Sequence, residues 1–254
     1  MALVTGASSG IGEVFARTLS GRGYRIVLVA RRKQRLETLA AELPGALVIP
    51  ADLTLKSDLD RIEQFIMDEP RLELLVNNAG FGISGCYFTT DVEAQDRMHQ
   101  LHIIATGRLT HAALRVMAAR SKGNIINVSS MAGFLQAPSS VSYNATKAWI
   151  NSFTEGLYLE LKSIHSQVRV QCLCPGFTYT EFQQTAGVDA SSIPKCLWMS
   201  AEAVVAASLR GLEKDKLFVI PGWRYRLGYA AIRILPRSLI HLYAMKYGRL
   251  RNTR

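Results

Sequence analysis

The sequence predicts one α/β domain, in which a doubly wound parallel sheet of about seven strands carries helices on both faces. Two observations support this prediction. Short apolar runs alternate along the chain with stretches of helical periodicity, and these runs are apolar at consecutive positions, as is typical of strands covered on both sides. The chain has 254 residues, 48% of them hydrophobic, which suits one large domain with a substantial core.

Seven apolar runs are the predicted strands, over residues 2–5, 25–30, 46–50, 72–76, 124–129, 168–173 and 217–220. Amphipathic helices are expected between them. In the segment 32–43, for example, Leu36, Leu39 and Leu43 recur on one helical face. This alternation implies parallel strands joined by right-handed crossovers. No repeat or long linker interrupts the pattern, so we expect one domain over residues 1–222.

The net charge of +10 is concentrated at the end of the chain. Residues 223–254 carry eight Lys or Arg and no Asp or Glu, which leaves 22 basic and 20 acidic residues in 1–222. We expect this tail to form two short basic amphipathic helices broken at Pro236. Two interpretations stay open: its apolar face docks on the body or on a second subunit, or it contacts a membrane surface peripherally. Charge confined to one segment argues against nucleic-acid binding.

Several classes of protein are excluded by composition. No window reaches the roughly 18 consecutive apolar residues of a membrane-spanning helix, and the first residues do not resemble a signal peptide. The four cysteines form no C-x-x-C pair, and the five histidines form no cluster with metal-ligand spacing. We therefore expect a cytoplasmic protein without a metal site, in which the tail is the one candidate for membrane contact.

A glycine-rich turn follows the first predicted strand and opens the first helix. Its candidate phosphate-binding residues are Gly6, Ser8, Ser9, Gly10, Ile11 and Gly12. Glycines allow a sharp turn and close approach of the backbone, and the N–H groups at a helix N-terminus bind pyrophosphate. An ordinary Gly/Ser-rich turn is the structural alternative.

Two arginines follow the second predicted strand, where an acidic residue would bind the ribose of NAD(H) and an arginine suits the 2′-phosphate of NADP(H). Arg31 and Arg32 therefore favour NADP(H), with NAD(H) as the second choice, although a solvated helix start would look the same. Asp52 and Leu53, after the third strand, are candidates for contact with the adenine. A turn or N-cap role for Asp52 is the alternative.

Polar residues also follow the fourth and fifth predicted strands. Asn78, Ala79 and Gly80 belong to an Asn-Asn-Ala-Gly motif that suits a chain crossing the cofactor's ribose, or a simple turn. Ser130 lies where open parallel sheets bind their ligands. Tyr143 and Lys147 are four residues apart, so a helix turns both to one side. Taken singly, each of these three side chains has a structural explanation.

Together, these motifs resemble those of the short-chain dehydrogenase/reductase family, whose members have a Rossmann fold, and the resemblance covers about residues 2–222. It implies that Ser130, Tyr143 and Lys147 form the catalytic set. It also implies that Pro175, Gly176, Thr178 and Thr180 belong to the segment that closes over the nicotinamide. The segment 197–202, Leu-Trp-Met-Ser-Ala-Glu, further suggests the branch of NADP(H)-preferring, uncharacterised bacterial-type members.

One position departs from the family's pattern. Where the family usually has an asparagine that holds a water beside the lysine, alignment on neighbouring residues puts His102. A histidine titrates near neutrality and would bend the helix and relay protons. Alternatively, His102 is a packed replacement with a slower proton supply.

The resemblance implies an NADPH-dependent oxidoreductase that transfers a hydride between the nicotinamide and a carbonyl or alcohol. Tyr143 would donate the proton, Lys147 would lower the pKa of Tyr143, and Ser130 would orient the substrate. Aromatic and apolar residues near the expected pocket and its lid, residues 180–199, favour a lipophilic substrate, unless they only pack the lid. A homodimer or homotetramer built on the region 90–165 is expected. The alternative is a cofactor-binding redox sensor or scaffold with little turnover, for which His102 is the only support.

Overall fold

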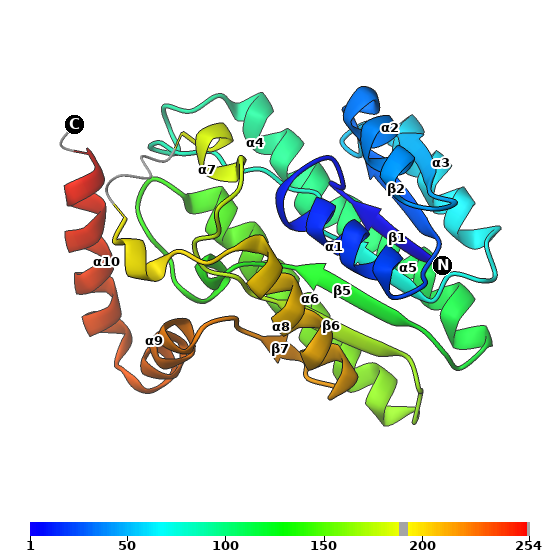
Figure 1. Cartoon of the computed structure of the whole chain (residues 1–254). Helices are drawn as coiled ribbons and strands as arrows, with labels where there is room; N and C mark the ends of the chain where they lie inside the picture. The colour runs from blue at the N-terminus through cyan, green and yellow to red at the C-terminus, as the bar shows by residue number, and fades with distance from the viewer. Residues whose placement is uncertain (188–192, 253–254) are drawn as a thin grey trace.

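A computed structural model describes residues 1–187 and 193–252 and shows a seven-stranded, entirely parallel sheet of order β3-β2-β1-β4-β5-β6-β7 (Figure 1). The strands are β1 (Ala2–Thr5), β2 (Ile26–Ala30), β3 (Leu47–Pro50), β4 (Leu74–Asn77), β5 (Asn124–Val128), β6 (Arg169–Leu173) and β7 (Phe218–Val219). Each predicted apolar run therefore contains a strand or overlaps one. The predicted fold class is confirmed.

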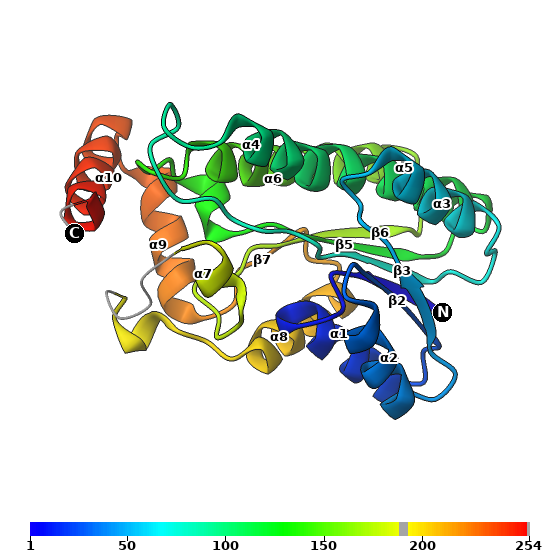
Figure 2. The ribbon, with the colours of Figure 1, turned by 90° about the horizontal axis from the view of Figure 1, so that it is seen from above.

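Helices connect the strands and cover both faces of the sheet. They are α1 (Gly10–Gly21), α2 (Lys33–Glu42), α3 (Lys56–Met67), α4 (Val92–His99), α5 (Thr106–Ala119), α6 (Val141–Ser163), α7 (Phe182–Thr185), α8 (Ala201–Glu213), α9 (Trp223–Ile234) and α10 (Arg237–Asn252). Seen along the sheet, α1, α2 and α8 lie on one side, and α3 to α6 lie on the other (Figure 2).

The uniformly apolar strands are explained by two cores, one on each face of the sheet. In β1, Ala2 and Val4 pack with α1, α2 and α8, whereas Leu3 packs with α3, α5 and α6. Successive side chains of a strand point to opposite faces, so a sheet with two covered faces needs an apolar residue at every position. The carboxyl ends of the strands consequently lie between two packed layers of helices. In open parallel sheets, ligands bind at this edge.

The helix that carries His102 is not regular. Helices α4 and α5 are joined without a break by a π-helical turn, Gln100–Ala105, which includes His102. Such a turn inserts an extra residue and is frequent at functional sites. The bend expected at His102 stays a prediction, and the π-helical turn is the irregularity that would allow it.

The basic tail forms two helices, as predicted, with Pro236 between them. They lie at one end of the molecule (Figures 1 and 2). Among the residues that the structure describes, no helix is long and apolar enough to cross a membrane.

Candidate active site

The glycine-rich turn has the geometry that a phosphate-binding turn requires. Gly6 and Gly10 have φ of +66° and +58°, in the left-handed region that favours glycine. A Cβ on Gly12 would lie 2.3 Å from the Gly6 carbonyl oxygen, so only glycine lets α1 approach the turn this closely. Ser9 is the N-cap of α1 but makes no side-chain capping bond, which leaves the first amides of the helix for an anion. The turn therefore fits the pyrophosphate of a dinucleotide.

The turn is tied to the end of β4 by Thr5 and Asn78. The Thr5 hydroxyl accepts hydrogen bonds from the Asn78 amide at 2.9 Å and from the Ala79 amide at 3.0 Å. The Asn78 side chain donates to the Thr5 carbonyl at 2.9 Å. Gly80 comes next, and a Cβ there would lie 2.8 Å from Nε2 of His102. These bonds place the predicted Asn78, Ala79 and Gly80 beside the phosphate turn.

Arg32 lies directly over the glycine-rich turn. Its guanidinium donates to the Ser8 hydroxyl at 3.1 Å and to the Ser9 hydroxyl at 2.7 Å. It also pairs with Glu181 at 2.8 Å, and Arg35 pairs with the same carboxylate at 2.6 Å. The hydrogen bonds from Arg35 and Arg32 lower the pKa of Glu181 to about 2. We name Arg32, Arg35 and Glu181 the arginine cluster.

Arg31, Asp52 and Leu53 border this region. Arg31 is exposed and lies 3.9 Å from the Asp52 carboxylate. Asp52 accepts hydrogen bonds from the amide and the hydroxyl of Thr54, which is the turn role left open above. The Leu53 side chain is buried in the core with α3, so only its backbone remains a candidate for contact with a cofactor.

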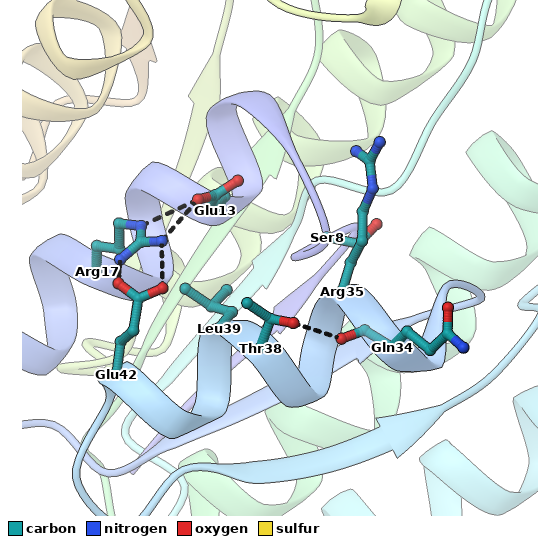
Figure 3. Close-up of a pocket in the computed structure, with 8 residues that line it drawn as sticks. All are labelled: Ser8, Glu13, Arg17, Gln34, Arg35, Thr38, Leu39 and Glu42. Atoms are coloured by element: carbon teal, nitrogen blue, oxygen red, sulfur yellow. Dashed lines mark hydrogen bonds and ion pairs between the residues drawn. The ribbon is translucent and has the colours of Figure 1, made fainter.

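A shallow pocket lies on the outer side of the arginine cluster, between α1 and α2 (Figure 3). Ser8 and Arg35 line one end of it. At the other end, Arg17 pairs with Glu13 and Glu42. None of Ser130, Tyr143 and Lys147 lines this pocket, so it is not the substrate site.

The structure brings Ser130, Tyr143 and Lys147 together at the carboxyl end of β5. Ser130 hydrogen-bonds to the Tyr143 hydroxyl and accepts a bond from the Ala132 amide at 3.1 Å. The Lys147 ammonium lies 5.7 Å from the centre of the Tyr143 ring. Lys147 is buried, and it donates to the Val128 carbonyl at 2.9 Å. The helical spacing of Tyr143 and Lys147 on α6 therefore produces the expected cluster.

Burial shifts the pKa values of both α6 groups. Burial raises the pKa of the Tyr143 phenol to about 12, against a smaller opposing effect of the hydrogen bond with Ser130. Burial also lowers the pKa of the Lys147 ammonium to about 8. Burial is the largest cause of the shift in Tyr143, so the expected lowering of its pKa by Lys147 stays a prediction. Tyr143 is therefore protonated at neutral pH and is ready to donate a proton.

The surroundings of His102 favour the packed replacement over the proton relay. Burial lowers the pKa of His102 well below its usual value, and the charge of Lys147 acts in the same direction. Nδ1 lies 2.9 Å from the Thr146 hydroxyl, and Nε2 accepts a hydrogen bond from the Phe81 amide at 3.2 Å.

The hydrogen bonds assign one tautomer to His102. The Thr146 hydroxyl donates to the Tyr143 carbonyl, so it accepts from His102, and Nδ1 carries the proton. Protonation of Nε2 would turn its N–H toward the Phe81 N–H. His102 is therefore a neutral, packed replacement for the asparagine, and it fixes the segment after β4 against α6.

The segment 175–180 lies over the site and is held from two sides. Thr180 contacts the glycine-rich turn, since a Cβ on Gly10 would lie 2.9 Å from its methyl group. The Pro175 carbonyl accepts from the Met131 amide at 3.0 Å, and the buried Thr178 donates to the Gly176 carbonyl at 3.1 Å. Residues 188–192 of the expected lid lie outside the described residues.

Tyr225 of the tail ties this segment to the far end of the lid. Its hydroxyl accepts from the Phe177 amide at 2.9 Å and donates to the Leu197 carbonyl at 2.6 Å. Its ring lies against Gly176, where a Cβ would come within 1.9 Å. Helix α9 thus packs on the body, and the boundary expected at residue 222 does not separate the tail from the site.

Four of the aromatic residues expected around the pocket pack against other aromatic side chains. Trp198 contacts Phe177 and Tyr179, and Phe134 contacts Phe218 and Tyr229. Two rings approach the catalytic cluster instead. The Phe182 ring lies 5.7 Å from that of Tyr143, and the Phe81 ring lies 6.1 Å from His102.

Sequence reasoning missed four residues of this site: Thr5, Arg35, Glu181 and Tyr225. Arg35 was detectable, because it lies one helical turn after Arg31 and Arg32. Glu181 and Tyr225 act through contacts between residues 149 and 48 positions apart, for which the sequence pattern carries no signal.

A parallel sheet with a glycine-rich turn before α1 and a Ser–Tyr–Lys cluster after β5 defines an NAD(P)-dependent α/β oxidoreductase. The family model described as short chain dehydrogenase matches residues 1–190. The chain therefore belongs to the short-chain dehydrogenase/reductase family, and it is an enzyme with NAD(P)-dependent alcohol dehydrogenase or reductase activity.

Known proteins similar to this chain agree with this assignment. An uncharacterised oxidoreductase of Staphylococcus epidermidis is 38% identical over 210 residues, which is 82% of this chain and 90% of that protein. A short-chain dehydrogenase from Sphingobium yanoikuyae, solved in complex with NADPH, is 35% identical, with a TM-score of 0.84 over 94% of both chains. A bulky-bulky ketone specific alcohol dehydrogenase from Comamonas testosteroni is 32% identical, with a TM-score of 0.78 over 100% of this chain and 94% of that one.

Proposed function

We propose that this enzyme is an NADPH-preferring reductase of lipophilic ketones or aldehydes. The observation that carries the cofactor preference is the position of Arg32, whose guanidinium reaches both Ser8 and Ser9 of the phosphate-binding turn. A planar guanidinium binds a phosphate bidentately, and Arg31 and Arg35 add positive charge at the same edge. The similar Sphingobium yanoikuyae enzyme was solved with NADPH, which supports this choice.

The catalytic roles follow from protonation states and positions. When bound, the dinucleotide supplies the hydride. Tyr143 donates its proton to the oxygen of the substrate carbonyl, because a phenol with a pKa of about 12 holds that proton at neutral pH. Ser130, hydrogen-bonded to Tyr143, orients the same oxygen and stabilises its developing charge. Lys147, with a pKa of about 8, is mostly cationic at pH 7 and stabilises the phenolate that remains.

The lipophilic substrate is proposed from what borders Tyr143. The ring of Phe182 approaches the phenol from α7, and α7 also packs against Gly82 beside Phe81. An apolar wall beside a single proton donor suits a substrate whose carbonyl is its main polar group. The similar Comamonas testosteroni enzyme is described as specific for bulky-bulky ketones.

We also propose that the enzyme is an oligomer and that it is located in the cytoplasm. The outer face of α6 carries Trp149 and Phe153, whose stacked rings are 4.6 Å apart and line a shallow depression. Such a pair on the surface suits the contact between subunits of a homodimer or homotetramer. Sedimentation of the wild type and of Trp149→Glu tests this, because loss of the contact lowers the molecular mass.

Activity is tested by NADPH oxidation with ketones and aldehydes of graded chain length. We expect kcat/KM to rise with apolar size, and Phe182→Ala to weaken that trend. Tyr143→Phe should lower turnover by about 10²–10⁴-fold while NADPH still binds. Wild-type turnover in Tyr143→Phe would refute the catalytic assignment, and equal rates across the panel would refute the substrate class.

Cofactor preference is tested by replacing Arg31 and Arg32 with neutral residues. We expect the Kd for NADPH to rise far more than the Kd for NADH. An equal change for both cofactors would mean that these arginines contribute only surface charge.

A further inference from the structure

Helix α9 is apolar on two opposite faces, and the residues that the structure describes cover only one of them. Tyr225 and Tyr229 face the body, where they contact Gly176 and Phe134. Trp223, Leu227 and Ile234 recur at i, i+4 and i+11, which places them on the opposite side of a helix. Their side chains are 56%, 62% and 82% exposed. We name these three residues the α9 stripe.

Arginines flank the α9 stripe on both sides. At 100° per residue, Arg226 and Arg233 lie beside one edge of the stripe and Arg224 beside the other. The Arg224 guanidinium lies 4.5 Å from the centre of the Trp223 ring, so the cation and the aromatic face solvent together. Residues 223–254 contain no Asp or Glu that could neutralise them.

Helix α10 adds further exposed apolar side chains. Five large apolar side chains in α10 and the residues just before it are about half exposed or more. They are Leu235, Leu239, Leu242, Tyr243 and Met245. Both helices lie at one end of the molecule (Figure 2). Several large exposed apolar side chains on two helices at one end of a protein indicate an interaction site.

Charge decides between the partners that could cover this surface. A second copy related by a two-fold axis would bring the same patch against itself, arginine against arginine, with no acidic residue between them. The body, with 22 basic and 20 acidic residues in 1–222, offers no strongly acidic alternative. Nucleic acid would pair with the arginines but would leave the α9 stripe in water. An anionic lipid surface satisfies both components, because its phosphates meet the cations and its acyl boundary takes the apolar side chains.

We propose that α9 and α10 bind the surface of an anionic membrane, with the α9 stripe at the boundary between headgroups and acyl chains and the flanking arginines on lipid phosphates. The helices lie in the plane of the interface and do not cross it. This proposal does not depend on the cofactor or the substrate proposed above.

Vesicle flotation of the full-length protein tests the proposal. We expect the wild type to float with vesicles of phosphatidylcholine and phosphatidylglycerol, but not with phosphatidylcholine alone, and to be released by high salt. Leu227→Glu should lower the partition coefficient at least tenfold. Ile164→Glu is the matched control, since Ile164 is 66% exposed at the end of α6 and lies outside the tail. Arg226→Glu with Arg233→Glu should abolish the preference for anionic vesicles.

Two results would overturn the proposal. One is a wild type that ignores anionic vesicles, or that binds them as well after Leu227→Glu as before. The other is an α9 stripe covered by a second copy of the chain. In that case sedimentation would show an oligomer that Leu227→Glu dissociates, and the wild type would not bind vesicles. NADPH titration of each variant verifies that the fold is intact, because the substituted side chains are exposed and distant from the cofactor turn.

Discussion

Replacing Glu181 with glutamine should tighten the binding of NADPH without changing that of NADH. The Glu181 carboxylate pairs with Arg32 at 2.8 Å and with Arg35 at 2.6 Å. In the proposed function Arg32 binds the 2′-phosphate, so the carboxylate and the phosphate compete for one guanidinium. NADH lacks that phosphate and does not compete. On the proposed function, Glu181 therefore weakens the preference for NADPH that we assign to the arginines.

The size of the effect follows from the exposure of the three side chains. Arg32, Arg35 and Glu181 are 42%, 51% and 44% exposed, so solvent screens both ion pairs. Exposed pairs contribute about 0.2–1 kcal/mol each. Since 1.4 kcal/mol corresponds to a tenfold change in affinity, removal of the carboxylate that competes for Arg32 should lower the Kd for NADPH by about 1.4- to 5-fold.

Cofactor fluorescence, titrated at low ionic strength, measures both affinities directly. Glu42→Gln is the matched control, because it removes a carboxylate from a similar pair with Arg17 at the far end of the same pocket (Figure 3). Equal tightening for NADPH and NADH, the same gain in Glu42→Gln, or weaker binding of NADPH in Glu181→Gln would each refute the competition. High salt should shrink the difference between wild type and Glu181→Gln.

Three further predictions concern stability and pH. Burial lowers the pKa of Lys147 from 10.5 to about 8, so the unfolded chain binds the proton more tightly. The free energy of unfolding of the wild type, compared with that of Lys147→Met, should therefore rise by up to roughly 3 kcal/mol between pH 8 and 10.5. Denaturant titrations at several pH values measure this, and the same pH dependence in both proteins would contradict it. Gly176→Ala should lower the free energy of unfolding by about 1–3 kcal/mol, because the added Cβ meets the Tyr225 ring. Thermal unfolding should show a much smaller loss when the same change is made in Tyr225→Ala. His102→Asn should leave the pH dependence of kcat/KM between about pH 5.5 and 7.5 unchanged, since His102 is neutral there; an inflection that disappears in the variant would refute this assignment.

Local patterns predicted the fold and the parts of the site that lie in consecutive residues. The strand Ala2–Thr5 coincides with its apolar run, and the glycine-rich turn follows it as expected, because both depend on short-range hydrophobicity and backbone freedom. The pairing of Tyr143 with Lys147 was predictable for the same reason, since helical periodicity fixes it.

What the sequence could not predict depends on long-range contacts and on burial. The low pKa of His102 was not predictable, because it results from burial and from the charge of Lys147, which is distant in sequence. The ion pairs of Glu181 likewise join segments that only the folded chain brings together. Environment, not residue type, sets the charge states at this site.

The hydrogen bonds of Tyr225 have a consequence for synthesis on the ribosome. Phe177 is synthesised 48 residues before Tyr225, whose hydroxyl accepts its amide hydrogen bond. The residues of the phosphate-binding turn and of the Ser–Tyr–Lys cluster are therefore all synthesised before this hydrogen bond can form. A protein terminated at Gly222 would lack Tyr225, and therefore both its hydrogen bonds and its contact with Gly176. We therefore expect truncation of the tail to alter both catalysis and the proposed membrane attachment, whereas point changes on the outer side of α9 should affect the attachment alone.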